Sequence, residues 1–336
     1  TSYTNKDNGK LALRLPFLDE TKFQDFPHSI NSEHKQMSEV EVAEAYAESS
    51  LNKNVIINPE EKLVLAPLLD KYVLSVTHLN NFLNVTKGGP HSFLEQNLLR
   101  CPQAKSANAA YGTAMHATME FIYHHLKNSG SLAELSAAQS FYEERLETAQ
   151  MTSPEFTKFL NRGKDELRTY LLTAANRFDS SHLIETNFSK QQVMVDDVHI
   201  AGNIDKIVPH EEDKTIEVYD FKTGKQASDW KRKDITLHSY KRQLIFYKLL
   251  IELSRDYSKY KVHTGYIEYL QPTERGELIL LPYQISEADV ERTKALIKVV
   301  DKKIRALDFP DVSGYEQTLA GVIQFEDDLI SEKIWF

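Results

Sequence analysis

Apolar residues recur at helical spacing through much of the first half of the chain. This pattern predicts helices over residues 38–50, 59–71 and 107–126, and two more within residues 131–178. Residues 74–77 lead into a further short helix, for which Ser75 or Thr77 is the candidate N-cap. The run Gly88-Gly89-Pro90 ends that helix.

The pattern changes after residue 178, where apolar and polar residues alternate and Val and Ile become frequent. Alternation of this kind predicts strands, here over residues 191–196, 198–208 and 215–222, with a charged turn at 210–214. A helix over 236–254, strands over 262–270 and 278–285, and a helix over 286–307 follow. The order predicts an α/β fold, a mixed central sheet flanked by helices, with residues 131–178 as an α-helical insertion in front of it.

Composition agrees with a globular chain of one large or two ordinary domains. Of 336 residues, 41% are apolar and 26% charged, which excludes general disorder. Apolar runs stay far below the length of about 20 residues that crosses a bilayer, so no membrane partner is expected. Cys101 is the only cysteine. A disulfide framework, a four-cysteine zinc site and an iron–sulfur cluster held by this chain alone are therefore excluded, and we expect Cys101 to be a small core residue.

The charge balance places a limit on nucleic-acid binding. Forty Lys and Arg against 49 Asp and Glu give a net charge of −9, so the protein has no global basic field. Residues 222–242 are an exception, because this segment contains seven Lys or Arg and only two acidic residues, Asp229 and Asp234, which gives a local net charge of +5. Such a run indicates either a surface that contacts phosphates or an ordinary solvated helix edge.

Two carboxylates and a lysine are the strongest candidates for chemistry. Side chains alternate along a strand, so Asp220 and Lys222 point to one face and Phe221 to the other. Asp205 lies 15 residues earlier on the preceding strand, and an antiparallel pairing can bring it to Asp220. Together they could hold a hard cation beside a lysine that orients water. The alternatives are a surface ion pair at Lys222 and a solvated Asp205 paired with Lys206.

Three further side chains could complete such a site. The imidazole of His116 can join carboxylates around a cation, although spacing alone does not favour it over His78 or His124. Gln243 and Tyr247 are four residues apart and therefore share one face of the predicted helix.

These residues occur in four short motifs, each weak alone, whose order is informative. They are Gly112-x-x-x-His116, Gly202-x-x-Asp205, Asp220-Phe221-Lys222-Thr223-Gly224 and Gln243-x-x-x-Tyr247. In this order the chain resembles a RecB-like nuclease of the PD-(D/E)XK superfamily over roughly residues 74–305. The resemblance implies the restriction-endonuclease-like fold and a Mg²⁺ or Mn²⁺ site. Its implied metal ligands are His116, Asp205, Asp220 and the main-chain carbonyl of Phe221.

The resemblance also implies roles for the remaining residues. Lys222 would be the catalytic lysine, acting with Asp205 and Asp220, while Gln243 and Tyr247 would steady the site and the DNA strand. Glu185 would be a supporting acidic residue before the first core strand. Lys225 is not part of the resemblance, but its place in the basic run makes it a candidate contact to DNA. Some relatives hold an iron–sulfur cluster through one Cys ahead of the His motif and three near the C-terminus. Residues 308–336 contain no Cys, so no such cluster is expected.

The N-terminal part resembles the context of a larger enzyme. Residues 74–82 and 93–102 are similar to the lead-in of nucleases that are fused behind a UvrD-like helicase. Residues 2–3 and 15–20 resemble the stretch that follows the last motif of that helicase. We therefore expect residues 1–73 to be a linker or helical lead-in from a helicase region of the same polypeptide. The nuclease domain would span 74–307 and a tail 308–336. This predicts a piece of a longer bacterial, cytoplasmic chain, itself without a Walker motif.

The leading hypothesis is a divalent-metal-dependent DNase, an exonuclease on single-stranded ends, that acts with the helicase in DNA repair or recombination. One alternative is a catalytically silent module of the helicase that clamps DNA. Another is a stand-alone nuclease of mobile-element or CRISPR type.

Overall fold

The computed structural model divides the chain into two compact units, Thr1–Leu51 and Asn52–Phe336. In the first unit the structure describes an antiparallel pair of two-residue strands, β1 (Lys6–Asp7) and β2 (Lys10–Leu11). In the second it describes residues 59–102, 106–149, 151–231 and 234–333. The helix expected over 38–50 lies outside the described residues.

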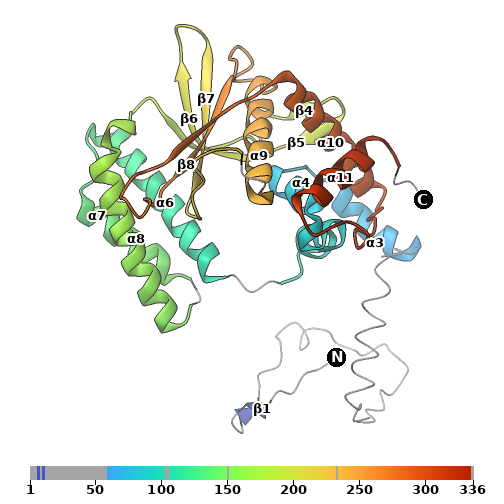
Figure 1. Cartoon of the computed structure of the whole chain (residues 1–336), viewed down its shortest axis with the longest axis horizontal. Helices are drawn as coiled ribbons and strands as arrows, with labels where there is room; N and C mark the ends of the chain where they lie inside the picture. The colour runs from blue at the N-terminus through green and yellow to red at the C-terminus, as the bar shows by residue number, and fades with distance from the viewer. Residues whose placement is uncertain are drawn as a thin grey trace. The chain divides into compact units, whose positions relative to one another are not determined.

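A five-stranded mixed sheet is the centre of the second unit (Figure 1). Its order is β3-β6-β7-β8-β9, in which β7 and β8 run parallel and the other neighbours antiparallel. The bounds are Leu183–Asn187, Asn203–His210, Thr215–Lys222, Thr264–Tyr269 and Leu280–Gln284. The mixed α/β fold expected from the sequence is therefore confirmed.

One face of the sheet is covered by α9 (Ile235–Glu252), the crossover helix that a parallel β7–β8 pair requires. Further helices pack around α9: α4 (Val76–Leu83), α10 (Glu287–Arg305) and α11 (Leu319–Ile330). Val218, Ile267 and Leu281 of the sheet join Leu244 and Phe246 of α9 in the larger hydrophobic core. Figure 1 shows these helices together to the right of the sheet.

The opposite face carries a three-helix layer, α6 (Ala107–Ser129), α7 (Leu135–Glu147) and α8 (Ser153–Thr173). Met115, Met119 and Tyr170 form a second core there with Phe221 and Leu270. The two helices expected within 131–178 are confirmed as α7 and α8, and they are part of the layer that covers the sheet.

Shorter elements complete the unit, and several were expected. Ser75 caps α4, since its hydroxyl accepts a 3.2 Å hydrogen bond from the amide of His78. Gly88, at φ +86°, separates the short helices that follow α4. The remaining elements are α3 (Pro59–Asp70), η1 (Val85–Lys87), α5 (Gly89–Phe93), η2 (Leu94–Leu98), η3 (Ala175–Arg177), and the hairpin of β4 (Val193–Val195) and β5 (Val198–Ile200).

Several expectations about elements were wrong. Residues 198–208 are not one strand, because the chain breaks at Ala201-Gly202 and continues in another sheet. Strand β3 and helix α11 were not expected at all. Cys101 is exposed and is not a core residue. Among the described residues, no helix is long and apolar enough to cross a membrane.

Candidate active site

Strands β6 and β7 place the two predicted aspartates side by side. The main-chain amide of Phe221, next to Asp220, donates a 2.7 Å hydrogen bond to Oδ2 of Asp205. Both carboxylates are almost completely buried, with exposed fractions of 7% for Asp205 and 1% for Asp220. The expectation that the strand pairing brings the two residues together is confirmed.

Lys222 lies on the same face as Asp220, as the strand alternation predicts. Its Nζ is 2.6 Å from Oδ2 of Asp220 and 3.1 Å from Oε1 of Gln243. Burial lowers the pKa of Lys222, but the charges of Asp220 and Asp205 outweigh burial and the pKa is raised. Lys222 is therefore an ammonium group held inside the protein, and the surface ion pair is excluded.

Helix α9 supports this pair from above the sheet. Nε2 of Gln243 donates to the hydroxyl of Tyr247 over 2.9 Å, and that hydroxyl donates to Oδ1 of Asp220 over 3.1 Å. Burial, followed by the nearby carboxylates, raises the pKa of Tyr247 well above its usual range, so the phenol keeps its proton. Both oxygens of Asp220 are thus oriented by contacts with its neighbours.

His116 reaches the carboxylates from α6. Its Nδ1 lies 3.6 Å from Oδ2 of Asp205 and 3.8 Å from Oε1 of Glu185, and its Nε2 lies 3.0 Å from the carbonyl oxygen of Phe221. Burial lowers the pKa of His116, but the adjacent carboxylates outweigh it and raise the pKa overall. Of the three histidines that spacing could not separate, the structure places this one at the site. His78 contacts Tyr72, and His124 contacts Glu120.

Glu185 has a more central place than its supporting role implied. Ligand atoms of His116, Glu185 and Asp205 all lie within 4.8 Å of one another. Glu185 has φ +46°, which is rare for a residue with a side chain, and it falls between the pairs Ile184↔Lys206 and Thr186↔Ile204. The register is the same on both sides of Glu185, so this residue lies opposite Asp205 on β6, and its carboxylate reaches His116.

The donor set suits a hard divalent cation. It combines carboxylates, one main-chain carbonyl and one imidazole, which Mg²⁺ and especially Mn²⁺ accept. Burial and the neighbouring Asp220 raise the pKa of Asp205 to about 7, because two adjacent carboxylates repel each other. Among the described residues, His116, Glu185 and Asp205 have ligand atoms close enough to share one cation and fit a metal site, whereas Asp220, a predicted ligand, is not in that group.

The basic run of residues 222–242 does not form one continuous phosphate-facing surface. Arg242 is 5% exposed and points into the core, where it forms an ion pair with Glu326. Lys241 lies over the rings of Trp230 and Tyr283, and Arg232 and Lys233 lie outside the described residues. Lys225 is exposed and lines a cavity next to Lys222.

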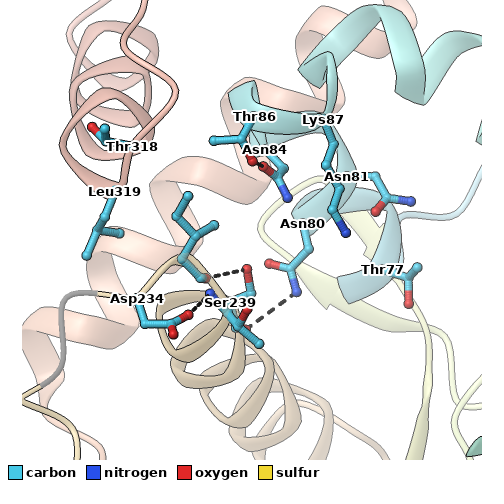
Figure 2. Close-up of a pocket in the computed structure, with 12 residues that line it drawn as sticks. Thr77, Asn80, Asn81, Asn84, Thr86, Lys87, Asp234, Ser239, Thr318 and Leu319 are labelled. Carbon is cyan, nitrogen blue, oxygen red and sulfur yellow. Dashed lines mark hydrogen bonds between the residues drawn. The ribbon is translucent and has the colours of Figure 1, made fainter. Parts of the chain in front are cut away.

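That cavity measures about 420 Å³ and lies between the N-terminal part of α6, α8 and the loop after β7. A larger cavity of about 670 Å³ lies between α4 and the N-terminal turns of α9 and α11. Figure 2 shows its amide and hydroxyl side chains, among them Asn80, Asn84 and Thr318. None of the candidate site residues lines the larger cavity.

Comparisons with known proteins agree with this geometry. The family model described as the PD-(D/E)XK nuclease superfamily matches residues 73–319, which include every candidate site residue. A search of the curated proteins finds no match.

Proposed function

We propose that this chain, which belongs to the PD-(D/E)XK nuclease superfamily, is a divalent-metal-dependent DNase that degrades single-stranded DNA from its ends. Its cellular role would be DNA repair or recombination, in concert with a helicase region of the same polypeptide. The observation that carries the proposal is the ion pair of Lys222, 19% exposed, with the buried Asp220, beside a group of His116, Glu185 and Asp205 that can share one cation.

Mg²⁺ or Mn²⁺ is the implied cofactor. His116, Glu185, Asp205, Asp220 and the carbonyl of Phe221 would hold it, and when bound it supplies Lewis-acid stabilisation of the phosphate and a more acidic water.

Four side chains of this protein would have separate roles in catalysis and DNA binding. Lys222 is protonated and therefore positions the attacking water and offsets the negative charge that develops on the phosphate. Gln243 fixes the ammonium of Lys222, and Tyr247 fixes the carboxylate of Asp220. Lys225, which is exposed on the loop after β7, would contact the DNA backbone.

Cleavage of matched linear and circular single-stranded DNA tests the proposal. Each substrate is incubated with Mg²⁺, Mn²⁺ or EDTA, for the wild type, Lys222→Ala and the control Lys298→Ala, an exposed lysine paired with Asp196. We expect metal-dependent loss of the linear substrate with the wild type and the control. Lys222→Ala should lose turnover by at least about a thousandfold but keep most DNA binding, since the lysine acts in the transition state.

Two results would contradict the proposal. Wild-type cleavage by Lys222→Ala would remove the catalytic role of that lysine. DNA binding by the wild type without cleavage in any metal would instead favour the silent clamp.

A further inference from the structure

The cavity beside the site opens at the residue that follows Lys222. Its wall consists of Thr223, Gly224, Lys225 and Gln226 of the loop after β7, Asn108 and Tyr111 of α6, Arg162 of α8, and Gln271. One wall therefore comes from α6, which also carries His116, and another from the loop that begins directly after Lys222. A DNA strand with one phosphate at Lys222 would run from there either into this cavity or away from it.

Arg162 is held in a fixed orientation at the cavity. Its Nε donates to Oε1 of Glu166 over 2.8 Å, and its Nη2 donates to Oε1 of Gln271 over 2.8 Å and to the carbonyl of Thr223 over 3.2 Å. The guanidinium carbon also lies 4.6 Å from the centre of the Tyr111 ring. None of the described residues accepts a hydrogen bond from Nη1, and 29% of the side chain is exposed.

The charge of the cavity favours an anion. Arg162 and Lys225 line it and no acidic residue does, although the whole chain carries −9. Glu166, which pairs with Arg162, is 5% exposed and does not line the cavity. A guanidinium whose position is already fixed loses little conformational entropy when it binds a phosphate oxygen.

The loop is open on one side at Gly224. A Cβ built on Gly224 would have no atom within 4 Å, so the space above this residue is open. Gly112 of α6, by contrast, approaches the loop closely, since a Cβ there would lie 3.2 Å from Oγ1 of Thr223. The close approach fixes the loop against α6 while its outer side stays accessible.

We propose that this cavity is a subsite for the phosphodiester next to the scissile one, and that the guanidinium of Arg162 binds this neighbouring phosphodiester. The assignment rests on the proposed nuclease function. It gives a part in substrate binding to α8, a helix that lies outside all four sequence motifs.

Salt-dependent DNA binding tests the assignment. A fluorescein-labelled oligo(dT) is titrated with Lys222→Ala protein in Mg²⁺ over a range of salt concentrations, so that binding is measured without turnover. Each phosphate contact on a single strand contributes about 0.7 to the slope of log K against log salt. When Arg162→Ala is combined with Lys222→Ala, we expect this slope to fall by about 0.7 and DNA binding at low salt to weaken about tenfold.

Three companion variants separate binding from folding. Arg162→Lys keeps the charge and should restore the slope, whereas a purely structural Arg162 would make this variant behave like the alanine. Lys225→Ala changes an exposed residue of the same cavity and should also lower the slope, even if Arg162→Ala fails to fold. Arg168→Ala, on the same helix with 57% of its side chain exposed, should leave the slope unchanged.

The possible results distinguish the two proposals. An unchanged slope in folded Arg162→Ala overturns the subsite while leaving the nuclease intact. Failure of the parent protein to bind DNA overturns both, and binding with the expected slopes but no cleavage by the wild type overturns the nuclease alone.

Discussion

Glu185 combines an uncommon backbone angle with a place at the candidate site. Its φ is +46°, and the register of β3 with β6 places it opposite Asp205. The carboxylate lies 3.8 Å from Nδ1 of His116, within the group that can share a cation. Backbone conformations of this kind cost about 1–3 kcal/mol and are found where function requires them.

We therefore expect Glu185→Ala to weaken Mn²⁺ binding by about tenfold or more, because the group loses one of its oxygen donors. Isothermal titration of the metal into the protein without DNA measures this directly. Glu120→Ala is the matched control, since the Glu120 side chain is 42% exposed on α6 and contacts His124. Equal Mn²⁺ affinity of the wild type and Glu185→Ala would place Glu185 outside the metal site.

Local periodicity explains which site residues the sequence could reveal. Strand alternation is enough to put Asp220 and Lys222 on one face, and helical spacing is enough for Gln243 and Tyr247. His116 could not be selected this way, because its partners are more than 60 residues away in the chain. Arg162 had no signal, since its role depends on the packing of α8 against the loop after β7.

At the scale of elements, one buried carboxylate attaches α11 to the rest of the unit. Glu326 of α11 accepts hydrogen bonds from Arg242 of α9 and, over 2.9 Å, from Arg292 of α10. It also contacts Nε2 of His238 over 2.8 Å. Burial raises the pKa of Glu326, but Arg242 and the other donors outweigh burial and lower it to about 2.

Glu326→Gln should destabilise the protein by about 3–5 kcal/mol at pH 7, since it leaves Arg242 buried without its counter-ion. The lowered pKa also fixes the sign of the pH dependence. The stabilisation is fully present above pH 4.5, the ordinary value for the group, and is lost as the pH falls toward 2. The stability difference between wild type and variant should therefore shrink over this window in urea unfolding.

Asp327→Asn provides the comparison for this experiment. Asp327 pairs with the same Arg292 but is 56% exposed, so its loss should cost less than about 1 kcal/mol. A difference between wild type and Glu326→Gln that stays constant from pH 7 to pH 3 would show that the pKa of Glu326 is the same in the folded and unfolded protein, and so is not lowered by its buried partners.

Elements differ in how well the sequence predicts them. Helices α6, α8 and α10 have one apolar face over 19 residues or more, so their pattern is clear. Strand β3 has five residues, none of them fully buried, and it therefore lacks the alternation that identifies a strand. Helix α11 does carry a local signal that our sequence analysis missed, since Thr318 caps it and the buried residues Val322, Phe325 and Leu329 recur at helical spacing.

At the scale of the molecule, the described cores and the candidate site all belong to one unit. Both hydrophobic clusters draw their described members from residue 65 onward, and α11, in the predicted tail, contributes Val322, Phe325 and Leu329 to the larger one. The boundaries expected at residues 73 and 307 remain predictions about evolutionary origin. Physically, the sheet needs both helical layers, since each face is apolar and must be buried.

A chain that begins at Asn52 should therefore keep the fold and the activity. The first compact unit ends at Leu51, and every described member of both hydrophobic clusters belongs to the second unit. We expect a thermal unfolding midpoint within about 2 °C of the full chain, since a loss of 1 kcal/mol would shift it by about 2–4 °C in a domain of this size. Metal-dependent cleavage of linear single-stranded DNA should persist at a similar rate. A markedly lower midpoint would mean that residues 1–51 stabilise the nuclease unit, and an unchanged midpoint with lost cleavage would mean that they act on the substrate instead.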